Sequence, residues 1–416
     1  MKVIFASALA IYMLAASLAS YAATAYTGSA PFNTAISGFA FSKVFDFDSY
    51  TAGTSVTACG MAAISAQGLD CDGATTIDLQ PVAADAYSTG STPISVGVSG
   101  SENQFLAGNG DHITFGFSRP IHAFGIYLIG NPSPTGDPAI PFWKMHASSG
   151  FDAYSATEPI QSLSLGNDVY FLGIVSPGSP FSQINLYSDN DPAAVYSFSV
   201  DNMILAADVP QLTLAEAKTN ASGDFVVSDI IVTRVHADRF NVEKSDWSGG
   251  MAVLGGGTSR DKAVSLFGTI QDTGDDEHVL KLVQLMNEAD STAPTALGMS
   301  CKSVGGGSSV GLQIGCTGSV GPNNIGLDVV AWGKVTAYDT TLAHAWITID
   351  DGSHRDSGMG SLGVKVEGPV WGDGRYIGEM VRVQGSSSLF KSGSDHYPLI
   401  RLAESGDITP FTGSSY

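Results

Sequence analysis

Basic residues are scarce in this sequence. It has 19 Lys and Arg against 40 Asp and Glu, which gives a formal net charge of -21 at pH 7. Between residues 23 and 210 the only basic residues are Lys43, Arg119 and Lys144. A protein that binds nucleic acid displaces counterions with a basic face. No such face is visible here, so we expect no nucleic acid partner, and the acidic balance is mainly a statement about solubility.

Cysteines are also few. The four are Cys59, Cys71, Cys301 and Cys316, and no C-x-x-C spacing or nearby histidine completes a tetrahedral zinc site. In an exported protein, cysteines that lie close together in pairs predict disulfides that close surface loops, here Cys59–Cys71 and Cys301–Cys316. The alternative is free buried thiols.

Long apolar runs are absent except at the N-terminus. After a basic start, residues 3–19 carry no charge, and residues 20–22 resemble a cleavage site. This order predicts a secretory signal over residues 1–22 and a secreted or cell-surface protein. The alternative is a retained membrane anchor, although the run is just short of a comfortable span. We expect no membrane span after signal removal, and no C-terminal anchor because residues 409–416 form no hydrophobic tail.

Long amphipathic helical patterns are nearly absent as well. Charged residues make up 14% of the chain, and glycine is abundant with 49 residues. Many short strands joined by Gly, Asn, Asp and Pro turns have this composition, so the sequence predicts an all-β protein. The chain is too long for one all-β domain and suits two or three.

The first half has strand-like segments at the spacing of a β-sandwich, which we place at residues 23–208. These segments alternate or run apolar and are separated by turn clusters. They are residues 42–47, 112–117, 122–129, 169–175, 183–187 and 196–205.

The second half contains one pattern twice, and such self-similarity in a fixed order identifies the structural unit. The better copy is residues 327–336, 346–353, 362–366 and 379–385, and the weaker copy is residues 225–233, 239–243, 248–253 and 263–268. Gly333 permits a bend in a long first strand, as a small barrel requires.

Two resemblances add to this interpretation. The first half resembles the exported bacterial jelly-roll domains that precede PEP-CTERM sorting tails, and this sequence lacks such a tail. The motifs that carry this likeness are Phe45-Asp-Phe-Asp48, Ile121–Ile126, Tyr170–Val175 with Pro180-Phe181, and Phe198–Asn202. The repeats resemble the tandem OB-fold domains of secreted bacterial proteins, which implies five-stranded OB-like barrels at residues 211–322 and 323–416. In the first copy, residues 243–246 replace the Asp350-Asp-Gly turn of the second.

Calcium is the cofactor that the acidic residues suggest. The first and last strands of a sandwich often lie together, which would bring Asp46 and Asp48 near Asp201 and Asn202, and the two-residue period places Asp46 and Asp48 on one face. The alternative is a solvated polar face with one Asp capping a turn. A second candidate group of oxygen ligands surrounds one loop and consists of Asp350, Asp351 and Asp356.

Aromatic residues on turns are candidate ligand contacts. Trp371 and Tyr376 lie on a glycine-rich turn, where they can stack on sugar rings, and Trp247 and Tyr397 are further candidates. For Trp332 and Trp346 we expect core packing instead. Residues 307–311 match G-x-S-x-G but lie in a loop between two cysteines rather than between a strand and a helix, so we predict no catalytic site.

These observations predict an exported, non-catalytic protein of the bacterial cell surface or matrix that binds an extracellular glycan or another surface protein. OB barrels bind oligosaccharides as well as oligonucleotides, and the export signal and acidic charge favour the former. One alternative is a fibre, surface-layer or adhesion subunit that associates with itself through exposed edge strands. Another is a polysaccharide hydrolase or lyase, which needs paired carboxylates that the sequence does not isolate.

Overall fold

The computed structural model describes fourteen stretches of the chain, and statements of absence below concern these residues. They are residues 23–45, 55–56, 58–67, 77–81, 94–97, 105–106, 112–130, 143–162, 168–188, 195–196, 198–220, 222–339, 345–368 and 377–411. The predicted signal at residues 1–22 lies outside them.

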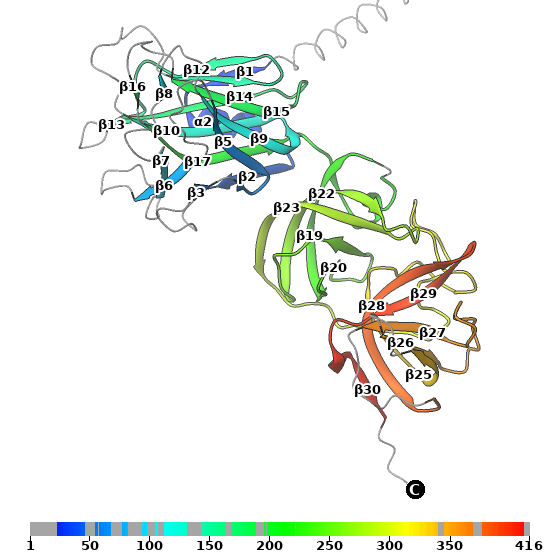
Figure 1. The fold of residues 1–416 in the computed structure, drawn as a ribbon. Helices are drawn as coiled ribbons and strands as arrows, with labels where there is room; N and C mark the ends of the chain where they lie inside the picture. The colour runs from blue at the N-terminus through cyan, green and yellow to red at the C-terminus, as the bar shows by residue number, and fades with distance from the viewer. Residues whose placement is uncertain are drawn as a thin grey trace, which may run out of the picture. The chain divides into compact units, whose positions relative to one another are not determined.

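The all-β prediction is confirmed, because the described residues are almost entirely strands, with two short α-helices (Figure 1). The chain divides into two compact units, Met1–Val209 and Pro210–Tyr416. No helix within the described stretches is long and apolar enough to cross a membrane.

The first unit contains two large antiparallel sheets. The larger follows the path β1 (Thr24–Tyr26), β14 (Asp168–Val175), β10 (Ala123–Gly130), β17 (Phe198–Ala207), β7 (Ile94–Gly97), β6 (Ile77–Pro81) and β3 (Ser55–Val56), with β13 (Gln161–Ser162) on β14 and β2 (Phe41–Phe45) on β17. The smaller follows β12 (Asp152–Tyr154), β11 (Trp143–Ala147), β15 (Phe181–Ser188), β9 (His112–Ile121), β5 (Ala62–Gln67) and β4 (Ala58–Cys59). A separate pair joins β16 (Val195–Tyr196) to β8 (Phe105–Leu106).

Aromatic side chains from the two large sheets pack against each other and form the core of a β-sandwich. The rings of Phe115 on β9 and Phe124 on β10 are 5.1 Å apart, and those of Trp143 on β11 and Tyr170 on β14 are 4.7 Å apart. Along β11, buried residues alternate with partly exposed ones, as expected for a strand with one face on a core. The sandwich character predicted for the first half is therefore confirmed.

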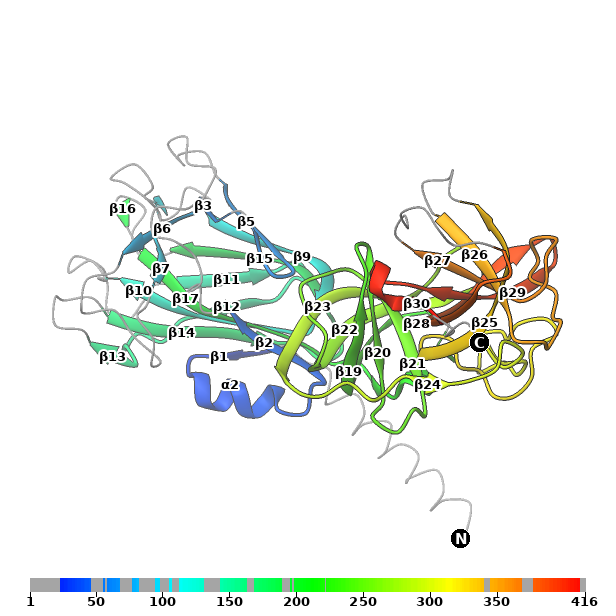
Figure 2. The ribbon, with the colours of Figure 1, turned by 90° about the horizontal axis from the view of Figure 1, so that it is seen from below.

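Helix α2 (Ser29–Ile36) covers the other face of the larger sheet and packs on β14, β10 and β1 (Figure 2). Its Phe32 is fully buried over two glycines of that sheet. A Cβ on Gly173 would lie 2.6 Å from the Phe32 ring, and a Cβ on Gly125 would lie 2.9 Å from it. The helix can approach this closely only because both positions lack side chains.

The second unit contains two closed five-stranded barrels with the same strand order. The first consists of β19 (Asp224–Val235), β20 (Arg239–Glu243), β21 (Gly250–Leu254), β23 (His278–Asp290) and β22 (Lys262–Asp272), closed by pairing of β19 with β22. The second consists of β25 (Asp328–Asp339), β26 (Ala345–Asp350), β27 (Val364–Gly368), β29 (Asp395–Arg401) and β28 (Met380–Ser392), closed by pairing of β25 with β28. The barrel character predicted for the second half is thus confirmed, and the two barrels share one strand order.

Short elements extend both barrels. The strands β18 (Gln211–Leu212) and β24 (Leu297–Gly298) each pair in parallel with the first strand of the barrel that follows. Helix α3 (Leu214–Ala217) begins with a capping box between Thr213 and Glu216. After β29, the 3-10 turn η1 (Ser405–Asp407) leads into β30 (Ile408–Pro410), which pairs with β28.

Each barrel has its own aliphatic core, and one prediction about core residues needs correction. Ala331 is buried inside the second barrel, whereas the neighbouring Trp332 is 39% exposed, so the expectation that Trp332 packs in the core is wrong. The two-residue period of β25 points Trp332 outward. Trp346 is partly buried. At Gly333 a Cβ would lie 2.8 Å from the backbone of Asp350, so the strand does come close to its neighbour there.

The predicted Cys301–Cys316 disulfide is also wrong, because both residues are free, buried thiols. Cys301 packs into the core of the second barrel, while Cys316 packs separately against Ile325 and Leu389. Burial raises the pKa of each thiol to about 12, so both stay protonated at neutral pH. The Cys59–Cys71 pairing involves Cys71, which lies outside the described residues.

Candidate functional site

The first predicted calcium group is only partly within the described residues. Asp46 and Asp48 lie outside them. Asp201 is in β17 opposite Tyr127, and the buried Asn202 follows it with a positive φ of 47°. The strands β2 and β17 do pair, with Phe45 opposite Met203, so the two segments that the prediction joins are neighbours. Calcium at this position stays a prediction.

The second predicted calcium group does not gather at one point. Asp350 accepts a hydrogen bond from the His354 amide at 3.0 Å, and Asp356 accepts one from the Gly358 amide at 2.9 Å. Asp351 accepts from the amides of Ser353 and Cys301 at 3.1 and 2.9 Å. Asp350 and Asp356 therefore stabilise their own turns, and Asp351 also joins its turn to the segment at Cys301. Within the described part of the chain, no three His, Cys, Asp or Glu side chains are grouped to hold a metal ion.

The predicted aromatic contacts Trp371 and Tyr376 lie outside the described residues. Trp247 is exposed, as expected, and its indole Nε1 donates to the Thr295 carbonyl at 2.9 Å. The Tyr397 ring packs beside Phe390 at 5.7 Å and beneath Gly358.

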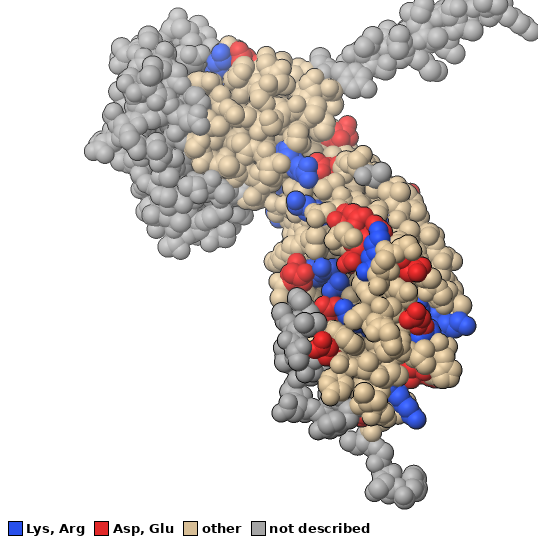
Figure 3. All heavy atoms as spheres, turned by 45° about the vertical axis from the view of Figure 1, so that its right-hand side comes forward, with Lys and Arg blue, Asp and Glu red and all other residues tan. Residues whose placement is uncertain are grey.

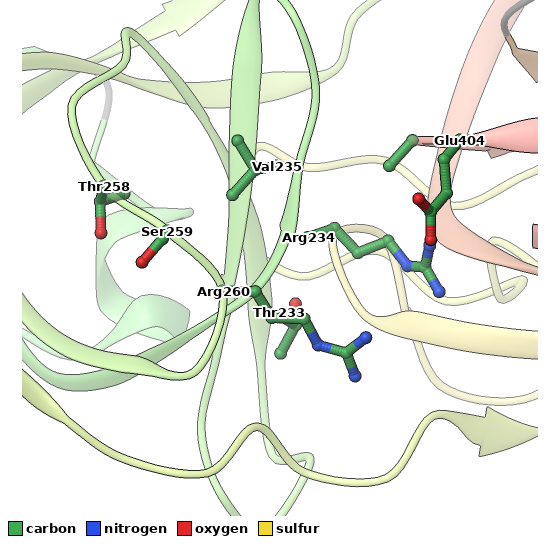
Figure 4. Close-up of a pocket in the computed structure, with 8 residues that line it drawn as sticks. Thr233, Arg234, Val235, Thr258, Ser259, Arg260 and Glu404 are labelled. Atoms are coloured by element: carbon green, nitrogen blue, oxygen red, sulfur yellow. The ribbon is translucent and has the colours of Figure 1, made fainter.

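A pocket of about 310 Å³ lies where the two barrels meet (Figure 4). It is formed by the end of β19, the loop between β21 and β22, and the residues just after β29. The lining residues are Thr233, Arg234, Val235, Thr258, Ser259, Arg260, Ala403 and Glu404. Both barrels contribute to it, so the pocket exists only when they are joined.

Arg234 is the central residue of the junction beside this pocket. Its Nε donates to Asp328 Oδ1 at 2.7 Å, and its Nη1 donates to Asp407 Oδ1. All three side chains are buried, and Asp328 is fully so. Burial alone would lower the pKa of Arg234, but the two carboxylates outweigh burial and raise it. The register shift in β19 between Val232 and Arg234 is a β-bulge, a feature that re-aims side chains.

The same network positions one wall of the pocket. Asp407 Oδ2 accepts hydrogen bonds from the backbone amides of Ala403 and Glu404, at 2.8 and 3.0 Å. Asp328 Oδ2 accepts from Gln384 Nε2 at 3.0 Å. Because Asp407 also pairs with Arg234, the ionic contact that joins the barrels holds the two lining residues in place.

Glu243 is the third buried carboxyl of the network. Its Oε1 accepts a hydrogen bond from the Asp328 amide at 2.6 Å. Burial raises the pKa of Glu243 to about 7, and it also raises the pKa of Asp328 despite the neighbouring Arg234. Glu243 is therefore largely protonated in the folded protein at mildly acidic pH.

Backbone contact also joins the barrels, between Gly250 at the start of β21 and Gly326 just before β25. A Cβ on Gly250 would lie 2.6 Å from the Gly326 carbonyl carbon, and a Cβ on Gly326 would lie 2.4 Å from that of Gly250. Nearby, Lys218 is buried and donates to the Ile325 carbonyl at 2.8 Å, and burial lowers the pKa of Lys218 to about 8. Packing and polar contacts thus hold the same junction.

The groups open to a ligand in the pocket are polar. The Arg260 side chain is 50% exposed and its Nε is 3.9 Å from Asp261, a loose ion pair. The Thr258 hydroxyl is buried without a hydrogen-bond partner among the described residues, and Ser259 and Val235 are exposed. An exposed guanidinium, the Ser259 hydroxyl and an apolar contact suit a small hydroxylated ligand, and the volume is at the lower end for small-molecule sites.

Replacing Glu243 with Gln is expected to change how stability depends on pH. The folded pKa of about 7 is above the unfolded value, so this group favours folding below about pH 4.5, and its contribution is lost as the pH rises through 7. Wild type should lose roughly 3 kcal/mol of unfolding free energy relative to Glu243→Gln between pH 4.5 and 8. Urea denaturation at half-unit pH steps measures the difference. The partly exposed Glu288→Gln is the control, and a constant difference between wild type and Glu243→Gln would show that Glu243 ionises normally.

The sequence contains a signal for this junction that the repeat pattern and the motifs do not reveal. Arg234 and Asp328 each lie inside an otherwise apolar strand segment, Ile-Ile-Val-Thr-Arg-Val and Leu-Asp-Val-Val. A charge in such a position is buried or nearly so, and buried charges are paired. That reasoning marks both residues as members of an ion pair, although it does not identify the partner.

The fold and the pocket together define an all-β protein made of a sandwich and two closed barrels, with a polar pocket between the barrels. No protein-family model matches the chain, and a search of curated proteins finds no match either.

Proposed function

We propose that the chain is an exported, non-catalytic protein that binds carbohydrate outside the cell, with a jelly-roll sandwich and two OB-type barrels. The pocket between the barrels is its ligand site. The observation that carries this proposal is the pair of exposed polar side chains that line it, the half-exposed Arg260 guanidinium and the Ser259 hydroxyl.

The charge distribution favours sugar over nucleic acid. Among the described residues on the face drawn in Figure 3, basic side chains of the second unit lie among acidic ones rather than in one continuous basic surface. Nucleic acid binding depends on such a surface. A sugar ring instead needs hydrogen-bond donors, acceptors and one apolar contact, which Arg260, Ser259 and Val235 supply. The pocket volume of about 310 Å³ suits one or two sugar residues.

Replacing Arg260 with Ala is expected to weaken sugar binding at least tenfold, equivalent to about 1.4 kcal/mol, without lowering the melting temperature. The loss follows from removing a charged donor that makes no strong contact within the protein. A glycan array with the full chain identifies the ligand, and calorimetry with that oligosaccharide compares the variants. Lys281→Ala, an exposed charge on the same barrel, is the matched control.

Three results would contradict the proposal. The first is an array without any bound glycan, and the second is equal affinity in wild type and Arg260→Ala. The third is turnover of a retained polysaccharide, which would make the protein an enzyme.

A further inference from the structure

We propose that the outer face of the second barrel, on strands β25, β28 and β30, is a separate binding surface for the chain of a uronic-acid-containing polysaccharide. We call it the Trp332 surface, and define it as Trp332, Lys334, Met380, Arg382 and Phe411. The inference takes carbohydrate as the ligand class from the proposed function, but it concerns a different surface from the pocket.

Trp332 is the centre of this surface. Its side chain is 39% exposed at the middle of β25, between the inward-facing Ala331 and Gly333. On the adjacent β24, Gly298 lies next to the indole. Even a Cβ added to Gly298 would be 3.6 Å from the indole ring. Gly298 therefore has no side chain that could cover the ring. The Trp332 indole is held on a rigid strand and is open to stacking.

The strand register places two cations beside the indole. Residues directly opposite each other in an antiparallel pair share a face of the sheet. Arg382 is opposite Trp332, and Met380 is opposite the exposed Lys334. The neighbouring β30 brings Phe411 next to Met380, since the Phe411 amide donates to the Met380 carbonyl at 2.9 Å, and Phe411 is 53% exposed.

Arg382 is held in place by a chain of hydrogen bonds that connects it to the barrel junction. Its Nη2 donates to Gln384 Oε1 at 2.9 Å, and Gln384 Nε2 donates to Asp328 Oδ2 at 3.0 Å. Asp328 in turn pairs with Arg234. A guanidinium oriented in this way has its remaining donors in a fixed direction, which suits bidentate binding of a carboxylate.

This combination identifies the ligand chemistry. Aromatic faces stack on the apolar faces of sugar rings, and the paired cations match the carboxylates of uronate residues. Single-stranded nucleic acid also stacks on aromatic residues, but its binding uses a positively charged groove along the backbone. This surface has two cations, Lys334 and Arg382, rather than a continuous basic groove, so we favour the uronate chain.

The test measures binding of the full chain to polygalacturonate, alginate and hyaluronate, with neutral dextran and oligo-dT as comparison polymers. We expect at least one uronate polymer to bind more tightly than both comparison polymers, and its binding to weaken with salt. Trp332→Ala and Arg382→Ala should each lose at least tenfold in affinity, whereas Trp332→Phe should stay within threefold. Tyr154→Ala, which removes an exposed aromatic side chain from the sandwich, is the matched control and should bind as wild type.

The outcomes separate this inference from the proposed function. Wild-type affinity in Trp332→Ala, preference for oligo-dT, or binding of no uronate polymer would overturn the Trp332 surface. If Arg260→Ala still loses the array-selected oligosaccharide in that case, the pocket proposal stands. Melting temperatures of all variants within about 3 °C of wild type exclude misfolding. Trp332→Phe keeps the test valid if Trp332→Ala fails to fold.

Discussion

Replacing Arg234 with Ala is expected to lower the unfolding free energy of the second unit by about 3–5 kcal/mol. The variant leaves Asp328 and Asp407 buried without their common partner. Removing one member of a buried ion pair is far more costly than the pair itself is favourable, because the remaining charge has neither water nor a counterion. Urea denaturation at pH 7, followed by tryptophan fluorescence, measures the change.

Arg260→Ala provides the control, since Arg260 also lines the pocket but is half exposed and only loosely paired. Surface changes of that kind alter stability by about 0.5 kcal/mol or less. At acidic pH the cost of Arg234→Ala should shrink, because buried carboxyls without partners become neutral by protonation. A cost below about 1 kcal/mol at pH 7 would mean that Arg234 does not hold the junction.

Gly326→Ala is expected to destabilise the second unit by about 2–4 kcal/mol, from two separable causes. Gly326 has a φ of +97°, a backbone conformation that strains residues with a Cβ. The added Cβ would also lie 2.4 Å from the carbonyl carbon of Gly250. Strain of this type costs about 1–2 kcal/mol and overpacking about 1–3 kcal/mol.

Two other glycine variants separate these causes. Gly321 has a φ of +85°, and a Cβ there meets nothing within 4 Å, so Gly321→Ala reports backbone strain alone. Gly250 has no positive φ, and a Cβ there would lie 2.6 Å from Gly326, so Gly250→Ala reports the close contact alone. Denaturation of all three should rank Gly326→Ala as the most destabilised. Equal losses for Gly326→Ala and Gly321→Ala would show that the barrels do not touch here.

Local sequence patterns predicted the classes of structure correctly. Apolar or alternating segments such as residues 122–129 and 169–175, which form β10 and β14, together with the glycine-rich turns, indicated an all-β chain with a sandwich in its first half. The repeat indicated two similar units, and both barrels have one strand order. These features depend on residues close together in the sequence, so spacing alone reveals them.

The errors and omissions concern contacts between distant residues. Cys301 and Cys316 are close in sequence, but they pack in different clusters, so proximity along the chain misled the disulfide prediction. Trp332 was expected in the core because tryptophan is large and apolar. Side chains alternate between the two faces of β25, however, and Trp332 is at a position that points outward. The junction was missed because Arg234 meets Asp407, which is 173 residues away.

One network connects the two proposed ligand surfaces. Arg234 contacts the pocket and pairs with Asp328, which binds Gln384, and Gln384 orients Arg382 on the Trp332 surface. The buried ions cost desolvation energy, and an apolar replacement is often as stable. We infer that their use here is positional, since they hold the polar groups of the pocket wall and the Trp332 surface in fixed directions.

The most direct measurement is a crystal structure of the full chain with the oligosaccharide selected on the glycan array. We expect a sugar residue in the pocket between the barrels, with its hydroxyls bonded to the Arg260 guanidinium and the Ser259 hydroxyl. A sugar bound elsewhere on the protein, with these two side chains unchanged and without ligand contact, would contradict the proposed site.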